Sequence, residues 1–191
     1  DLTPNRGDCL SHLGVARELG LVENQQVKRR PAKLKECSDS AAKAIKIIIH
    51  DADSCPRYAA RVIKGIKVGP SPGWLTERLK SVGLKSINNI VDAANYMLMD
   101  SGHPMHTFDL ARIDGKEINV RLAKEGEKIT TLDEVERKLK DFHLLICDGE
   151  KPVALAGIMG GSNSEIDENT TDILIESAYF EPTVIRKCAK Y

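Results

Sequence analysis

The chain has 191 residues, 41% of them hydrophobic and 29% charged, so it can bury an ordinary core and suits one domain or one domain with a small appendage. Its 28 basic residues balance 28 acidic ones, and a formal net charge of zero argues against autonomous, high-affinity, nonspecific binding of nucleic acid. This charge balance still allows a local basic surface on the protein, or binding of RNA that a larger assembly delivers.

The cysteines and the apolar runs indicate the cellular setting. The five cysteines are odd in number, widely spread and without a CxxC pair, which argues against a disulfide framework or a closed zinc site and favours reduced thiols in a cytoplasmic protein. No apolar run reaches the length of a membrane span and no signal peptide is visible, so we expect no membrane partner. The first residue is not Met, and we expect an excised piece of a longer polypeptide.

The sequence of the first third of the chain predicts a helix, a linker and two strands. Asp8 is the expected N-cap of a helix that stops at Gly20. The charge-rich residues 22–35 are typical of a linker. The two expected strands are residues 44–51 and 57–68.

Two helices are expected next. Ser71 is the predicted N-cap of the first, with Pro72 at its first helical position and Gly83 at its end. Asn88 or Asn89 is expected to cap the second, whose apolar residues fall on one face.

From residue 116 onward the sequence alternates or runs apolar in short pieces. The expected strands are residues 117–123, 128–132, 136–141, 143–148, 151–161 and 172–180. Asp148 and Gly149 form a hairpin signal, and Pro182 lies in the first turn of a last helix. The pattern predicts an α+β fold with mainly antiparallel or mixed β-sheets flanked by a few helices.

Two histidines, His103 and His106, flank a proline after the second of these helices. A zinc site would need a third ligand at a familiar spacing, and Pro104 breaks helical geometry, so we expect no metal. His106 and Asn95 fit polar groups presented beside a cleft, and plain loop punctuation is the open alternative.

A glycine-rich stretch and an isolated carboxylate are the other candidates. The segment LAGIMGGSNSE, residues 155–165, lacks the Lys-Ser/Thr ending of a P-loop, so we expect no ATP there; its glycines permit either a bound ligand or a simple bulge. Glu176 stands among apolar residues of an expected strand. It is either buried with a partner or ligand, or it faces water from an edge strand.

Five segments together carry a family resemblance. They are LTPNRGDCLSHLGVARELG, VGPSPGWLTERLKSVGLKSINNIVDAANYMLMDSGHPMHTFDL, TLDEVERKL, ALAGIMGGSNSEI and ILIESAYFEPTVIRKCAK. In this order they resemble the β subunit of bacterial phenylalanyl-tRNA synthetases over nearly the whole chain. The resemblance implies that residues 1–34 are a helix and linker from the end of a preceding module. Residues 35–191 would be the editing domain, formed by the third and fourth B modules and truncated at its C-terminal end.

The resemblance implies hydrolysis of tyrosine mischarged onto phenylalanine tRNA, so this fragment would carry the editing esterase site and not the aminoacylation site. It implies no cofactor in the fragment, with ATP and magnesium needed by the whole enzyme. The implied partners are the phenylalanine tRNA and the alpha subunit of the synthetase, in the cytoplasm. The alternative is a non-catalytic binding or scaffold module that recognises tRNA or an aromatic amino acid.

The same resemblance assigns residues. His106 and Asn95 match catalytic positions, with His106 positioning water or the ester while the terminal ribose hydroxyl of the tRNA assists, and Glu176 matches the glutamate that reads the tyrosine hydroxyl. The other residues it places along the substrate pocket are Ala94, Pro104, Ala156 and Gly157. Ala94 stands where family members often carry Thr, which puts one substrate hydrogen bond in doubt. The family continues past Tyr191 with a Thr-x-Ala-type stretch that completes the pocket wall, so we expect these 191 residues alone to edit poorly.

Overall fold

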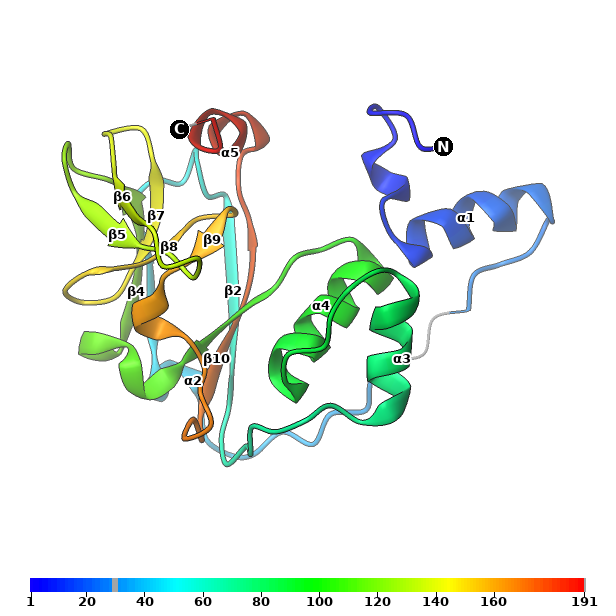
Figure 1. Ribbon diagram of the computed structural model, residues 1–191, viewed down its shortest axis with the longest axis horizontal. Helices are drawn as coiled ribbons and strands as arrows, with labels where there is room; N and C mark the ends of the chain where they lie inside the picture. Colours follow the sequence, from blue (N-terminus) through cyan, green and yellow to red (C-terminus); the bar gives the residue numbers. More distant parts are fainter. Residues whose placement is uncertain (29–30, 191) are drawn as a thin grey trace. The chain divides into compact units, whose positions relative to one another are not determined.

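The computed structural model describes residues 1–28 and 31–190, and the chain divides into two compact units (Figure 1). We call them the helical unit and the β unit. The helical unit is Asp1–Asp39 with Gly69–Met105, and the β unit is Ser40–Val68 with His106–Tyr191. Arg29 and Arg30 of the expected linker lie outside the described residues, as does Tyr191. The expected domain boundary at residue 35 stays a prediction.

The helical unit contains the predicted helices with a correction at the first. Its elements are η1 (Gly7–Cys9), α1 (His12–Val22), α3 (Gly73–Ser81) and α4 (Asn89–Ser101). Asp8 is not the N-cap of α1; Ser11 is, because its side chain accepts the amide of Gly14 at 3.0 Å, and the helix continues two residues past Gly20. Asn88 caps α4 as predicted. None of the helices among the described residues has the length and apolar character needed to cross a membrane.

Asp92 in α4 organises the loops around α3. It is fully buried, and its carboxylate accepts the hydroxyls of Ser71 and Ser86 at 2.5 Å each and the amide of Ile87 at 2.9 Å. Ser71 is therefore not the N-cap of α3 as predicted: that position is Pro72, which has no side-chain cap. The serine hydroxyl helps satisfy a buried charge instead.

The β unit is built from three sheets, and the predicted α+β fold with antiparallel and mixed sheets is confirmed. Its strands are β1 (Lys46–Ile49), β2 (Arg57–Ile63), β3 (His106–Asp109), β4 (Glu117–Leu122), β5 (Lys128–Thr130), β6 (Glu136–Lys138), β7 (Leu144–Cys147), β8 (Pro152–Leu155), β9 (Met159–Gly160) and β10 (Ile173–Tyr179). Its helical elements are α2 (Ala41–Ala44), η2 (Leu110–Arg112), η3 (Asp114–Lys116), η4 (Ser162–Ser164) and α5 (Pro182–Cys188).

The strand orders are β1-β4-β7-β8-β9, β2-β10-β3 and β5-β6. The β1–β4 pair is parallel, and the other pairs between these strands are antiparallel. In sequence, β1 and β2 precede the second stretch of the helical unit while their partners β4 and β10 follow it (Figure 1).

Strand β7 lies at the centre of two cores, which explains why its sequence does not alternate. Leu144 and Ile146 belong to a core shared with Phe108 of β3, so this core joins the five-stranded and three-stranded sheets. Leu145 and Cys147 belong to a second core on the other face. All four β7 residues are buried because both faces of the strand are covered.

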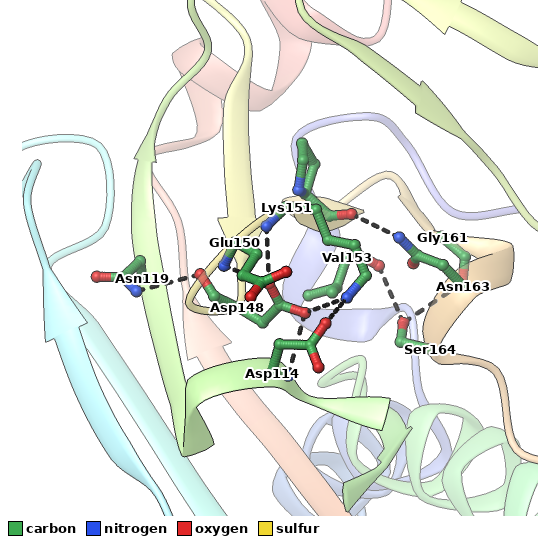
Figure 2. Close-up of polar contacts among 10 residues, drawn as sticks. Asp114, Asn119, Asp148, Glu150, Lys151, Val153, Gly161, Asn163 and Ser164 are labelled. Atoms are coloured by element: carbon green, nitrogen blue, oxygen red, sulfur yellow. Dashed lines mark hydrogen bonds and ion pairs between the residues drawn. The ribbon is translucent and has the colours of Figure 1, made fainter. Parts of the chain in front are cut away.

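The predicted hairpin at Asp148 and Gly149 is confirmed, and a polar cluster holds it (Figure 2). The Asp148 side chain is fully buried. Its Oδ1 accepts the amides of Glu150 and Lys151 at 2.8 Å each, and its Oδ2 accepts the amide of Asp114 at 3.2 Å and the Lys151 ammonium at 2.8 Å. Lys151 also pairs with the Asp114 carboxylate. One carboxylate thus ties the β7–β8 turn to η3.

We predict that Asp148→Ala lowers the free energy of unfolding by about 3 kcal/mol, because it removes a buried carboxylate that accepts three backbone amides and pairs with the Lys151 ammonium. Urea unfolding monitored by circular dichroism measures this. Asp141→Ala is the matched control, since Asp141 is an exposed aspartate in the turn that precedes β7. We expect the free energy of unfolding of this variant to change by no more than about 0.5 kcal/mol. Equal effects of the two substitutions would contradict the role given to Asp148.

Candidate functional site

Glu176 occupies the middle of the three-stranded sheet. Strand β10 pairs with β2 on one side and β3 on the other, and Glu176 lies opposite Ala60 and His106. The residue is only 6% exposed. The alternative of an edge strand with its carboxylate facing water is therefore wrong, and Glu176 is a buried acid that needs a hydrogen-bond donor.

The donor is Tyr58 of β2. Its hydroxyl donates to Oε2 of Glu176 at 2.8 Å. Tyr58 lies opposite Ala178, the next residue on the same face of β10, so it reaches Glu176 along the diagonal of the strand pair. Sequence reasoning missed Tyr58: the alternation of β2 indicates its face, but its partner lies 118 residues away.

The second carboxylate oxygen of Glu176 is accessible. No group in the described part of the chain bonds to Oε1, whereas every buried side-chain nitrogen or oxygen there has a hydrogen-bond partner. Oε1 therefore contacts solvent-accessible space although most of its residue is buried. It is an acceptor with no donor among the described residues.

Burial sets the protonation of both groups. It raises the pKa of Glu176 to about 7, and the hydrogen bond from Tyr58 opposes the increase. Burial, followed by the nearby Glu176 carboxylate, raises the pKa of Tyr58 well above its usual value near 10. Tyr58 consequently stays a protonated donor throughout the neutral range.

His106 lies at the start of β3 and not in a loop as the sequence suggested. It is the direct partner of Glu176 in the antiparallel pair, so the two side chains share one face of the sheet. Its ring packs edge-on against Phe108 with 4.5 Å between centroids. Burial lowers the pKa of His106 to about 4, so the imidazole is neutral at pH 7. Neither ring nitrogen forms a hydrogen bond to another described residue. Since every fully buried side-chain nitrogen in the described part of the chain has a partner, neither ring nitrogen is fully buried.

Gly160 forms the surface against which this imidazole rests. A Cβ atom at Gly160 would lie 2.5 Å from Cε1 and 2.8 Å from Nε2 of His106. Real side chains do not approach so closely, so the position requires glycine while His106 keeps its place. The sequence marked Gly160 as part of a glycine-rich segment, but not for this reason.

Ala156 and Gly157 form the start of the turn between β8 and β9. Ala156 is fully buried, and its amide donates to the carbonyl of Leu144 at 3.0 Å, so that amide is already used in the sheet. Gly157 is exposed with a φ of +66°, and a Cβ there would lie 3.2 Å from the Phe180 ring. The positive φ favours glycine at this turn.

The remaining site residues belong to the helical unit. Ala94 and Asn95 are half-buried in α4, and Pro104 is exposed in the segment that follows it. The structure thus brings together His106 and Glu176, with Gly160 beside them, inside the β unit. That Ala94, Asn95 and Pro104 join them in one pocket stays a prediction.

One acidic group in the helical unit has the spacing of metal ligands. Ligand atoms of Asp8, Cys9 and Glu18 lie within 4.8 Å of one another. Arg6 pairs with both carboxylates at 2.9 Å, so a guanidinium already occupies the position between them and offsets part of their charge. We assign no metal to this group.

Comparison with known families gives the broader assignment. A family model described as the B3/4 domain matches residues 54–191. The chain belongs to the B3/4 domain family.

Relatives of this B3/4 chain are subunits of one enzyme. The chain is 52% identical over 189 residues to the phenylalanine–tRNA ligase beta subunit of Geobacter metallireducens, and 51% identical over 189 residues to that of Syntrophotalea carbinolica. Each match covers 99% of this chain and 24% of the relative, so the chain spans about a quarter of the length of these relatives. The expected homology to beta subunits of phenylalanyl-tRNA synthetases is confirmed, and the editing role stays a prediction.

A solved structure shares the fold. The crystal structure of an N-terminal fragment of the phenylalanyl-tRNA synthetase beta-subunit from Pyrococcus horikoshii matches with a TM-score of 0.55 and 14% sequence identity. The match covers 97% of this B3/4 chain and 58% of that one.

We predict that Glu176→Gln changes how the stability of the B3/4 chain depends on pH. The pKa of Glu176 is about 7 when folded and 4.5 ordinarily, so the folded state binds the extra proton between these values. Its contribution to stability is therefore fully present below pH 4.5 and is lost as pH rises through 7. Glutamine does not titrate, so the stability of the variant relative to the parent should rise across this window, by roughly 3 kcal/mol at most.

Chemical unfolding of both proteins at a series of pH values measures the difference. Comparison with the parent is necessary because His106, with its folded pKa near 4, contributes the opposite slope: stability is lost as pH falls from 6.5 toward 4. Glu165→Gln is the control, since Glu165 is exposed. A Glu176→Gln curve parallel to the parent curve would show that the carboxyl of Glu176 is not perturbed by burial.

Proposed function

We propose that this B3/4 chain forms the editing site of a phenylalanine–tRNA ligase beta subunit and hydrolyses tyrosine mischarged onto phenylalanine tRNA. One observation carries the proposal: a buried carboxylate, Glu176, has one accessible oxygen and lies directly opposite the neutral imidazole of His106. A hydroxyl-reading group and a group that can position water or an ester therefore share one face of a sheet.

Discrimination between tyrosine and phenylalanine explains the use of a buried acid. A pocket shaped for phenylalanine rejects tyrosine only by excluding a hydroxyl, and apolar pockets discriminate such additions by only about a hundredfold. A second pocket with a buried acceptor selects in the opposite sense. Tyrosine donates its hydroxyl to Oε1 of Glu176, whereas phenylalanine desolvates that carboxylate without giving it a donor.

His106 is assigned to the ester. A neutral imidazole can accept a hydrogen bond from water or donate one to the ester, and the backbone of Gly160 fixes the ring from one side. The terminal ribose hydroxyl of the tRNA assists, and Asn95 of the helical unit orients the substrate. A covalent thiol route is not proposed: burial, followed by the charge of Glu176, raises the pKa of Cys55 to about 11, so this thiol is protonated at neutral pH.

The remaining requirements belong to the complete synthetase. Aminoacylation, with ATP and magnesium, takes place outside this chain, the alpha subunit is the protein partner, and the tRNA brings the mischarged ester in the cytoplasm. The second candidate is a non-catalytic module that binds tRNA or an aromatic amino acid. The accessible oxygen of Glu176 supports recognition over a purely structural role, and release of tyrosine from the tRNA separates hydrolysis from binding.

Glu176→Ala and His106→Ala should have different signatures in the complete synthetase. Glu176→Ala should reduce the ratio of Tyr-tRNA to Phe-tRNA deacylation rates, on the order of tenfold to a hundredfold, because a hydrogen bond to a charged group is worth roughly 1.5–3 kcal/mol. His106→Ala should slow both substrates together, since positioning water or the ester does not depend on the substrate hydroxyl. Rates are measured with tRNA charged separately with each amino acid.

Glu165→Ala on the exposed surface is the control and should leave both rates unchanged. An unchanged ratio in Glu176→Ala would remove Glu176 as the specificity residue. Absence of Tyr-tRNA hydrolysis in the parent synthetase, with binding retained, would instead favour the non-catalytic module.

Gly160→Ala should reproduce the His106→Ala pattern, because a methyl group would displace the imidazole it touches. We expect slower deacylation of both substrates, with the Tyr-to-Phe ratio nearly preserved. Gly7→Ala is the control, because in the described part of the chain nothing beyond the two neighbouring residues lies within 4 Å of a Cβ placed there. A selective loss with only one substrate would show that Gly160 acts elsewhere than on His106.

A further inference from the structure

The contact between Tyr58 and Glu176 has no part in the hydrolysis as proposed. The tyrosine hydroxyl donates to Oε2 at 2.8 Å, and Oε1 is left accessible. Tyr58 presents to the carboxylate the same phenol group that a mischarged tyrosine would bring. The two oxygens of Glu176 therefore have different surroundings before any substrate arrives.

A fixed donor matters because a carboxylate rotates readily. The terminal torsion of a glutamate side chain is broad, so packing alone sets the plane of the carboxylate poorly. A hydrogen bond from a phenol, whose ring has few rotatable bonds, fixes one oxygen and with it the direction of the other.

On the side of β2, the nearest neighbours of Glu176 on its face of the sheet are small. Its partner in β2 is Ala60, and the following residue on its own face of β10 is Ala178. Both are small, so along β2 the first long side chain is Tyr58, opposite Ala178. His106 lies opposite Glu176 on the β3 side, and on the β2 side the hydrogen bond from Tyr58 is the interaction that orients the carboxylate.

We propose that Tyr58 is a positioning residue for substrate specificity: it holds Oε2 of Glu176 and thereby directs Oε1 toward the hydroxyl of a tyrosine attached to tRNA. This inference rests on the proposed function of the site. The role given to Tyr58 is to hold Glu176, with no part in the hydrolytic step, so its effect should appear in selectivity.

The same bond affects the charge of the site. The titratable groups that face Glu176 are Tyr58 from β2, Cys55 just before that strand, and His106 from β3. Of these, Tyr58 donates to the carboxylate and lowers its pKa against the effect of burial. Without the phenol hydroxyl, Glu176 should become ionised, and Tyr-selective, only at higher pH.

The test is Tyr58→Phe in the complete synthetase. We expect the Tyr-to-Phe ratio of deacylation rates to fall roughly tenfold at pH 7. Phe-tRNA deacylation should be nearly unchanged, and the pH at which selectivity is half-maximal should move upward. Tyr179→Phe is the matched control, because Tyr179 is a half-exposed tyrosine on the opposite face of β10. In this variant, the ratio of deacylation rates and its dependence on pH should equal those of the parent.

A double-mutant cycle with Glu176→Ala tests whether Tyr58 affects selectivity through Glu176, because alanine leaves no acceptor for the Tyr58 hydroxyl. If Tyr58 acts through Glu176, then Tyr58→Phe in the Glu176→Ala background changes the ratio of deacylation rates no further. This comparison also covers the case in which Tyr58→Phe alone folds poorly, because the buried charge left without a donor is absent from the double variant.

The outcomes separate the inference from the proposed function. A parent-like ratio and pH profile in Tyr58→Phe, with Glu176→Ala still reducing the ratio, would overturn the positioning role and leave the editing function standing. A further loss in the double variant would show that Tyr58 acts independently of Glu176 and would also overturn it. If Glu176→Ala itself left the ratio unchanged, the proposed function would fail first.

Discussion

A carboxylate between two β-sheets must be given a hydrogen-bond donor, and the β unit is arranged around that requirement. Glu176 lies in the central strand of a three-stranded sheet whose inner face shares a core with the five-stranded sheet. Desolvation on this scale opposes ionisation, and one phenol limits the cost. The sheet therefore keeps, near neutral pH, an acid that can gain or lose its proton in response to small changes around it.

The histidine opposite Glu176 experiences the same burial with the reverse effect. Low solvent exposure disfavours charge on both side chains, so it raises the pKa of the acid and lowers that of the base. Because His106 stays neutral at pH 7, it does not take the proton of Glu176, and the two side chains do not form a salt bridge. Gly160 adds a steric constraint, because its missing side chain leaves room for the imidazole. Electrostatics and packing thus keep His106 neutral and in place without a dedicated hydrogen-bond partner among the described residues.

Local patterns predicted much of this fold, and long-range pairing explains the rest. Most strands, the Asn88 cap and the hairpin at Asp148 follow from alternating or short apolar runs and from turn chemistry, whereas β3 was expected to be a loop. The start of α1 was misplaced because Asp8 and Ser11 are both good caps, and only the bond to an amide distinguishes them. Alternation gives the face of Glu176 but not whether β10 is central or at an edge. Tyr58 could not be identified for the same reason, since the register between distant strands is absent from either local sequence.

The interleaved order of the two units has a consequence during protein synthesis. Strand β2 leaves the ribosome long before β10, and the bonded residues Tyr58 and Glu176 are separated by 118 positions. At roughly 5–20 residues per second, β2 waits on the order of ten seconds for the strand that completes its sheet. During that interval its apolar face and unpaired edge are open to nascent-chain chaperones, while the α3–α4 segment, whose contacts are short in sequence, can already form. The buried acid would be enclosed among the last groups of the β unit, once translation of β10 is complete.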